Sequence, residues 1–170
     1  MFKHIETLEI WGCGSLISLA PSVSSLGNLS HLDVWKCEGL LNLVTSSTAQ
    51  SMRHLTKLRI RECEMVEEIV AGGEDGREDQ ITWDNLKSLE LRCLASLTCF
   101  SRANHTFKFP DLEEVIVTRC PEMKAFSGGV SITPKLKSVK LAVGDAKGCW
   151  KGDLNTTIQQ LCAELVSVYH

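Results

Sequence analysis

The chain has 170 residues, of which 44% are hydrophobic and 23% charged, and its formal net charge is -3. This composition indicates one globular domain with a continuous core. The small negative charge gives no general attraction to nucleic acid or to anionic membranes, and no apolar run approaches the roughly 18 residues that a membrane helix needs. The start of the chain lacks the pattern of a secretory signal, which favours the cytoplasm.

A short pattern recurs along the chain. Two aliphatic residues stand two positions apart, and a cysteine usually follows three positions after the second, as in LEIWGC, LDVWKC and LRIREC. Successive copies are 24 to 31 residues apart, and Leu94 replaces the cysteine in the fourth copy. The six copies begin at Leu8, Leu32, Leu58, Leu89, Val115 and Val139.

This period and pattern are the signature of leucine-rich repeats, in which each copy contributes one short strand to a parallel sheet. We therefore expect an α/β solenoid, a right-handed superhelix with a curved parallel sheet of about six repeats and a C-terminal capping helix. The repeats would occupy residues 1–143, and a linker and the helix residues 144–170. The apolar edge of the first repeat, next to Met1, is expected to be uncovered.

The C-terminal segment changes pattern from strands to a helix. Asp153 is placed to cap the N-terminus of this helix, because its side chain can accept a backbone hydrogen bond from the first turn. One apolar stripe follows and is expected to cover the open end of the core. Its residues are Leu154, Ile158, Leu161, Leu165 and Val166.

The cysteines fall at one phase of the repeat rather than in metal-binding pairs. Cys13, Cys37, Cys63 and Cys120 all follow a predicted strand, and zinc sites need close C-x-x-C or Cys/His spacing that is missing here. A buried thiol serves at this position as a compact apolar residue with a weak donor. We expect a structural role for these cysteines, with no metal and no cofactor.

The longest interval between copies holds a glycine-rich acidic stretch, residues 72–80, which predicts an exposed loop with or without a role in docking a partner. Trp83 follows it and is expected to anchor the chain back onto the solenoid. Phe107 and Phe109 lie in another irregular stretch and are predicted to belong to the core.

Alternation along each strand predicts which side chains face solvent on the concave side of the sheet. One predicted row contains Trp and Arg, the residue types enriched at binding hot spots. The alternative is that the two Trp rings stack and Arg side chains cap them, as a local shield. A second row, Glu9, Asp33, Arg59, Glu90, Ile116 and Lys140, mixes signs and is interpreted as a solvated face with incidental pairs. The predicted protein-binding residues are Trp11, Trp35, Arg61 and Arg92, with His31, Lys57 and Arg59 beside them.

The stretches LEIWGCGSLISL, LDVWKCEGLLNL, FPDLEEVIVTRCPEMKAF and CWKGDLNTTIQQL resemble the C-terminal leucine-rich repeats of plant nucleotide-binding disease-resistance receptors of the coiled-coil class. The resemblance implies a role in innate immunity, with a protein partner. That partner would be a pathogen effector, a host protein modified by one, or the receptor's own nucleotide-binding domain. The sequence has no G-x-x-x-x-G-K-[ST] loop, so nucleotide binding does not carry over to these residues.

Two other classes of function compete with this one. The cysteine-bearing repeat also resembles that of F-box substrate receptors of ubiquitin ligases, which an F-box segment would distinguish. An enzyme is not expected, because the histidines are scattered and no cysteine stands where a reactive thiolate would form. The five histidines are His4, His31, His54, His105 and His170.

Overall fold

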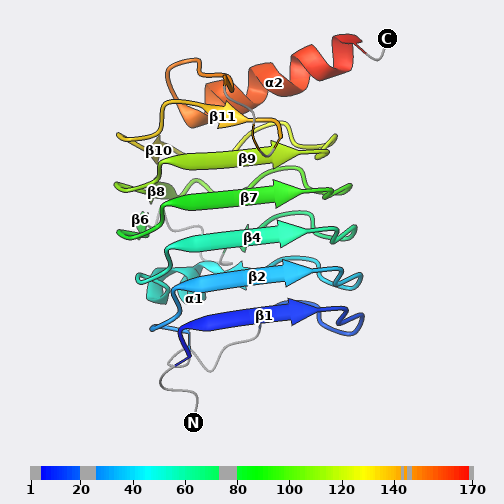
Figure 1. Cartoon of the computed structure of the whole chain (residues 1–170), viewed down its shortest axis with the longest axis vertical. Coiled ribbons are helices and arrows are strands. Elements are labelled where there is room, and N and C mark those ends of the chain that lie inside the picture. Colours follow the sequence, from blue (N-terminus) through cyan, green and yellow to red (C-terminus); the bar gives the residue numbers. More distant parts are fainter. Residues whose placement is uncertain (1–4, 20–25, 73–79, 143, 145–146, 169–170) are drawn as a thin grey trace.

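The computed structural model describes residues 5–19, 26–72, 80–142, 144 and 147–168, with side chains described as far as Leu161. Figure 1 shows one ladder of parallel strands that rises in chain order from the N-terminal end to a helix at the C-terminal end. The ladder is a six-stranded sheet of β1 (Thr7–Trp11), β2 (His31–Trp35), β4 (Lys57–Arg61), β7 (Ser88–Arg92), β9 (Glu114–Thr118) and β11 (Val139–Lys140).

The register of this sheet confirms the repeat alignment. Leu8 pairs with Leu32, Leu32 with Leu58, and Leu58 with Leu89, so equivalent residues of successive repeats lie side by side. The unequal intervals between repeats are absorbed in the connections and leave the strand pairing unshifted. The predicted leucine-rich-repeat solenoid is therefore confirmed.

Short strands form a second layer behind the main sheet, and the sequence did not predict them. They follow the same parallel order as the repeats, since the coils that begin at β2, β4, β7 and β9 each pass through both layers before the chain returns to the main sheet. A six-residue helix, α1 (Ser46–Ser51), follows the first of them. These strands are β3 (Val44–Thr45) with β5 (Val70–Ala71), and β6 (Gln80–Thr82) with β8 (Thr106–Lys108) and β10 (Ser131–Ile132).

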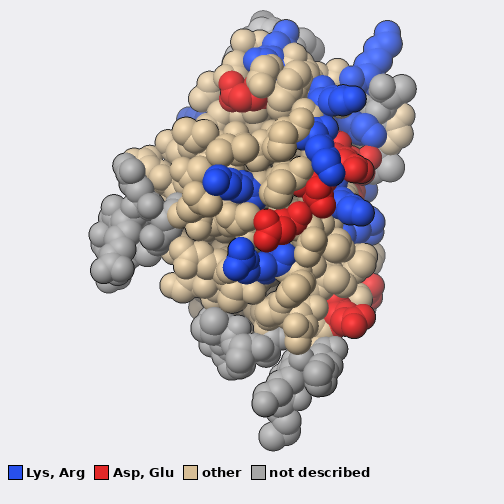
Figure 2. Space-filling view, turned by 90° about the vertical axis from the view of Figure 1, so that its left-hand side faces the viewer, with Lys and Arg blue, Asp and Glu red and all other residues tan. Residues whose placement is uncertain are grey.

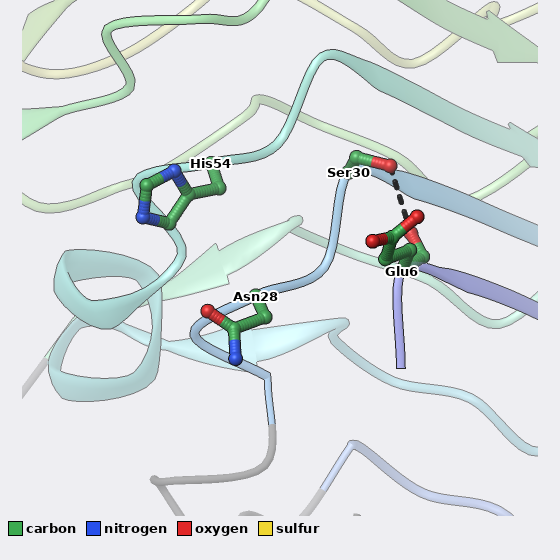
Figure 3. Close-up of a pocket in the computed structure, with 4 residues that line it drawn as sticks. All are labelled: Glu6, Asn28, Ser30 and His54. Atoms are coloured by element: carbon green, nitrogen blue, oxygen red, sulfur yellow. Dashed lines mark hydrogen bonds between the residues drawn. The ribbon is translucent and has the colours of Figure 1, made fainter. Parts of the chain in front are cut away.

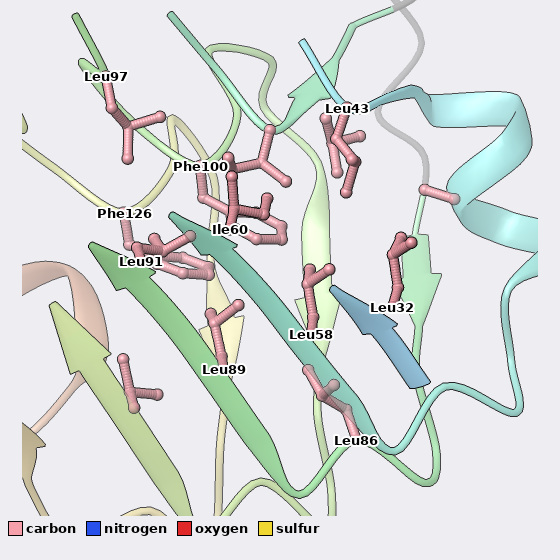
Figure 4. Packing of buried hydrophobic residues seen from close by; sticks show 14 of the residues in the cluster. Leu32, Leu43, Leu58, Ile60, Leu86, Leu89, Leu91, Leu97, Phe100 and Phe126 are labelled. Carbon is pink, nitrogen blue, oxygen red and sulfur yellow. The ribbon is translucent and has the colours of Figure 1, made fainter. Parts of the chain in front are cut away.

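The core lies between the two layers. Ile60 and Leu91 of the main sheet belong to the same buried cluster as Phe100 and Phe126 from the connections (Figure 4). The aromatic rings of the back layer pack edge to face or in stacks, for example Phe100 on Phe126 at 4.7 Å between centroids. Phe107 and Phe109 are fully buried, which confirms their predicted place in the core.

The turn after each main strand explains the repeated cysteine. The residue after the strand has a left-handed backbone, with φ between 52° and 68°, and its N–H donates to the last carbonyl of the next strand, as Lys36 does to Arg61 at 3.1 Å. At the cysteine the chain turns back under the strand that it has just left. The cysteine S–H donates to the last carbonyl of that strand. In the fourth repeat Cys93 takes the left-handed position and Leu94 fills the buried one. The S–H donors and their acceptors are Cys13 to Trp11, Cys37 to Trp35, Cys63 to Arg61 and Cys120 to Thr118.

The two ends of the ladder differ in how much of their apolar surface is covered. In the first repeat Leu8 and Ile10 are partly exposed, whereas their equivalents Leu32 and Val34 are buried, as expected for the first repeat. At the other end α2 (Leu154–Val168) packs against β11. Its buried residues Leu154, Ile158 and Leu161 join the core.

The start of α2 is capped as predicted, because Asp153 Oδ1 accepts the backbone N–H of Thr156 at 2.8 Å. Hydrogen bonding to Thr156 lowers the pKa of the Asp153 carboxyl. The side chains of Leu165 and Val166 and residues 73–79 of the acidic stretch lie outside the described part of the chain. The division into a repeat region 1–143 and a C-terminal segment 144–170 stays a prediction.

Candidate protein-binding face

The face of the six-stranded sheet that points away from the core carries three rows of side chains, and we call it the outer face. Strand alternation sends every second residue to this face, and the parallel register brings equivalent positions together. All seven predicted contact residues lie on it, on four neighbouring strands. The first row is Thr7, His31, Lys57, Ser88 and Glu114; the middle row is Glu9, Asp33, Arg59, Glu90, Ile116 and Lys140; the last row is Trp11, Trp35, Arg61, Arg92 and Thr118.

The last row begins with two tryptophans in contact. The rings of Trp11 and Trp35 are 5.9 Å apart between centroids, and 67% of Trp11 is exposed. Arg61 lies over the Trp35 ring at 5.1 Å, and Lys36, from the turn after β2, lies over it at 5.0 Å. The predicted capping by Arg61 is thus present, whereas the two rings touch at a tilt of 36° instead of stacking, and most of Trp11 stays open to solvent. Sequence reasoning missed Lys36, because the left-handed turn removes it from the strand alternation.

A connected set of ion pairs crosses the middle of the outer face. Arg59 Nε donates to Glu90 Oε2 at 2.8 Å, and Arg59 also lies 3.7 Å from Asp33. Arg61 donates to the same Asp33 at 3.0 Å, and Arg92 lies 3.4 Å from Glu90. Each carboxylate is therefore shared by two guanidinium groups. We call these five residues the charge network.

The charge network corrects the interpretation of the middle row as a solvated face. Only 6% of Glu90 and 5% of Ile116 is exposed, so the centre of this row is buried beneath its neighbours. A buried carboxylate is tolerated when charged donors satisfy it, and Arg59 and Arg92 do so for Glu90. The interpretation was wrong because the row was considered alone, whereas Arg61 and Arg92 reach into it from the last row.

Charges of both signs therefore mix on this molecule. Figure 2 views the side on which the main strands begin, and basic and acidic residues lie next to one another there. Along the sheet Lys140 adds a further pair with Glu114, at 2.9 Å. The outer face is thus built for charge complementarity rather than for general attraction to a polyanion.

Two donors of the outer face lack acceptors. Trp35 Nε1 and Arg61 Nε are both buried, and neither has a hydrogen-bond partner. Buried donors without acceptors are costly, at about 1–3 kcal/mol each. Both belong to residues of the predicted contact row.

Two hollows lie near the beginnings of the first strands. One, of about 250 Å³, is on the outer face itself and is lined by Thr7 and Glu9, by residues 31–33, and by Lys57 and Arg59. The other, of about 530 Å³, is open and is lined by Glu6, Asn28, Ser30 and His54 (Figure 3). Ser30 Oγ donates there to the Glu6 carbonyl at 2.9 Å. The first hollow brings together three of the predicted contact residues: His31, Lys57 and Arg59.

The thiol and imidazole groups of the described residues are the candidates for metal binding and for ready ionisation. No group of three or more His, Cys, Asp or Glu side chains among the described residues could hold a metal ion. His31 Nδ1 lies 2.9 Å from Ser30 Oγ. Burial, with a smaller contribution from neighbouring groups, raises the pKa of the Cys63 thiol to about 11, which leaves it protonated and unreactive at neutral pH.

The raised pKa of Cys63 predicts a loss of stability in alkali. Below pH 9.0 the thiol is protonated in both states, whereas above it the unfolded chain ionises first, until the folded chain follows near pH 11. The free energy of unfolding should therefore fall by at most about 1.4 kcal/mol per pH unit across this window through Cys63 alone. Urea unfolding of the wild type and of Cys63→Ala at pH 8, 9, 10 and 11 measures this, and the variant should show the shallower fall. Parallel falls in the two proteins would contradict the prediction.

The family model described as plant disease resistance protein RPS2-like, leucine-rich repeats, matches residues 20–142. No curated protein and no solved structure matches the chain. Across the described residues, neither helix combines the length and the apolar character that crossing a bilayer requires. The matched range contains β2 to β11, and with them six of the seven predicted contact residues.

Proposed function

Because the chain belongs to the family of plant disease resistance RPS2-like leucine-rich repeats, we propose that it is the protein-recognition module of an innate immune receptor and acts in the cytoplasm. Its ligand would be a pathogen effector, a host protein that effectors modify, or the receptor's own nucleotide-binding domain. The described cysteines are free thiols, which suits a reducing compartment.

The observation that carries the proposal is the last row of the outer face. An exposed Trp11 in contact with Trp35, followed in register by Arg61 and Arg92, presents the residue types that dominate binding energy at protein interfaces. The ion pairs hold the Arg side chains in place, so less conformational entropy is lost when a partner contacts them. We propose that this row forms the contact surface, flanked by His31 and Lys57.

The proposal is of binding rather than catalysis. Solenoids of leucine-rich repeats typically act as protein-interaction modules, because a parallel sheet displays a broad regular surface. Arg59 is engaged by carboxylates on both sides, so it contributes mainly by positioning its neighbours. The family match favours the resistance-receptor interpretation over the F-box alternative.

The test is direct binding to candidate effectors and to nucleotide-binding domains of the same receptor class, measured by surface plasmon resonance on the purified chain. A double variant, Trp11→Glu with Arg92→Gln, should weaken binding of a genuine partner by at least about a hundredfold. Both side chains are at least one third exposed, and the glutamine amide can still donate to Glu90, so the variant is expected to fold. Lys124→Glu, on an exposed side chain away from this face, is the matched control. A partner that binds the double variant as tightly as the wild type would refute the proposed surface.

A further inference from the structure

The distribution of charge among the three rows of the outer face is uneven, and it bears on the chemistry of the partner, given the function proposed above. The last row carries Arg61 and Arg92 and has no acidic residue. The first row carries Lys57 in its centre, and its acidic member, Glu114, is paired with Lys140. Acidic groups between these two basic positions are confined to the middle row.

The basic groups of the first and last rows retain hydrogen-bond donors that no carboxylate engages. Lys57 forms no ion pair with the described residues, and 37% of the Arg92 side chain is exposed with one contact of 3.4 Å to Glu90. The charge network as a whole holds three guanidinium groups for two carboxylates. A complementary surface must therefore supply acceptors with negative charge to the first and last rows.

The middle row sets the opposite requirement. Asp33 and Glu90 flank Arg59 between the two basic rows, so these three residues carry a net charge of -1, which a partner carboxylate placed there would meet. Lys57 and Arg61 are four positions apart along β4, with Arg59 midway between them, so the two basic rows are about 13 Å apart. In an extended peptide, side chains i, i+2 and i+4 point to one side and span the same length.

We infer that the outer face binds an extended protein segment with acidic side chains at positions i and i+4 and a basic or neutral side chain at i+2. The two carboxylates lie over Lys57 and over the Arg61–Arg92 pair, and the central residue lies over Arg59 beside Asp33, the more exposed of the two carboxylates that flank it. Recognition thus depends on the positions of the charged residues along the segment and not on its net charge alone.

The test uses two blocked peptides of identical composition and net charge, Glu-Ser-Lys-Ser-Glu and Glu-Ser-Glu-Ser-Lys, titrated into the isotope-labelled chain and followed by NMR amide and indole shifts. The first peptide should shift signals of β4 and β7 and of the Trp11 and Trp35 indoles, with an affinity that falls as salt is added. Lys57→Gln and Arg92→Gln should each weaken it by about three- to tenfold, and Lys124→Gln should leave it unchanged. The second peptide should bind at least about tenfold more weakly.

The inference would be overturned if the two peptides bound equally tightly. It would also be overturned if neither Lys57→Gln nor Arg92→Gln changed the affinity for the first peptide. Tighter binding of oligouridylate through the same residues would overturn it too, since it would point to phosphate. These outcomes leave the proposed function standing if a protein partner still depends on Trp11 and Arg92. Conversely, if a partner binds the double variant as tightly as the wild type, the proposed surface is refuted irrespective of the peptide results.

Discussion

Replacement of Trp83 by Ala is expected to lower the free energy of unfolding by about 3–5 kcal/mol, the range for a large aromatic residue removed from a close-packed core. Trp83 has no exposed surface and packs against Phe109 at 5.6 Å and Phe100 at 6.0 Å. Its Nε1 donates to the carbonyl of Ala49 in α1 at 2.7 Å. The side chain thus joins the back layer to α1, and urea unfolding followed by circular dichroism measures its loss.

Trp83→Phe separates packing from the hydrogen bond. The smaller ring keeps the apolar contact but gives up the donor to Ala49, whose carbonyl still accepts the N–H of Met52 at 3.1 Å. We therefore expect Trp83→Phe to cost less than half as much as Trp83→Ala. Equal and small losses in the two variants would show that the anchor contributes little to the fold.

The main sheet could be predicted because its signal is local and repeated. Leu58 and Ile60 alternate with polar residues, Cys63 follows at the turn, and the same spacing returns in the neighbouring repeats, so both the strand and its register follow from the alignment. The anchor at Trp83 followed from the same logic, since a large aromatic residue after a polar insertion has to find a place in the core. Its acceptor in α1 did not follow, because nothing near Trp83 in the sequence points to Ala49.

The back layer escaped prediction for a physical reason. The pair β3 and β5 has two residues in each strand, Val44–Thr45 against Val70–Ala71, which is too short to show an alternating pattern. Their pairing is imposed by the register of the main sheet, which stacks the coils. A repeat alignment extended through the connections would have brought Val44 opposite Val70.

On the outer face, alternation placed the side chains correctly but did not give their pairs. Arg61 stands in register with Trp35, yet its guanidinium reaches Asp33 one row away. Arg92 in turn bonds to Glu90 on its own strand. Long side chains select partners diagonally as well as across, so the charge network becomes visible only when the three rows are considered together.

Asn155→Ala is expected to destabilise the last repeat by about 2–4 kcal/mol, because one side chain satisfies three backbone groups there. Asn155 Oδ1 accepts the N–H of Phe126 at 2.9 Å and of Ser127 at 2.8 Å, and its Nδ2 donates to the Gly129 carbonyl at 2.9 Å. The first turn of α2 is thereby fastened to the connection that follows β9. Hydrogen exchange at the two amides, together with urea unfolding, measures the effect.

Asn155→Asp is the matched control for this fastening. Its carboxylate can still accept from Phe126 and Ser127 but cannot donate to Gly129, so the loss of stability should be smaller and the two amides should stay protected. If Asn155→Ala left the exchange of both amides unchanged, the hydrogen bonds would not hold α2 in place. Protection lost in the Ala variant and kept in the Asp variant would instead assign the attachment of α2 to its polar first turn, with Leu154, Ile158 and Leu161 adding buried area once the helix is docked.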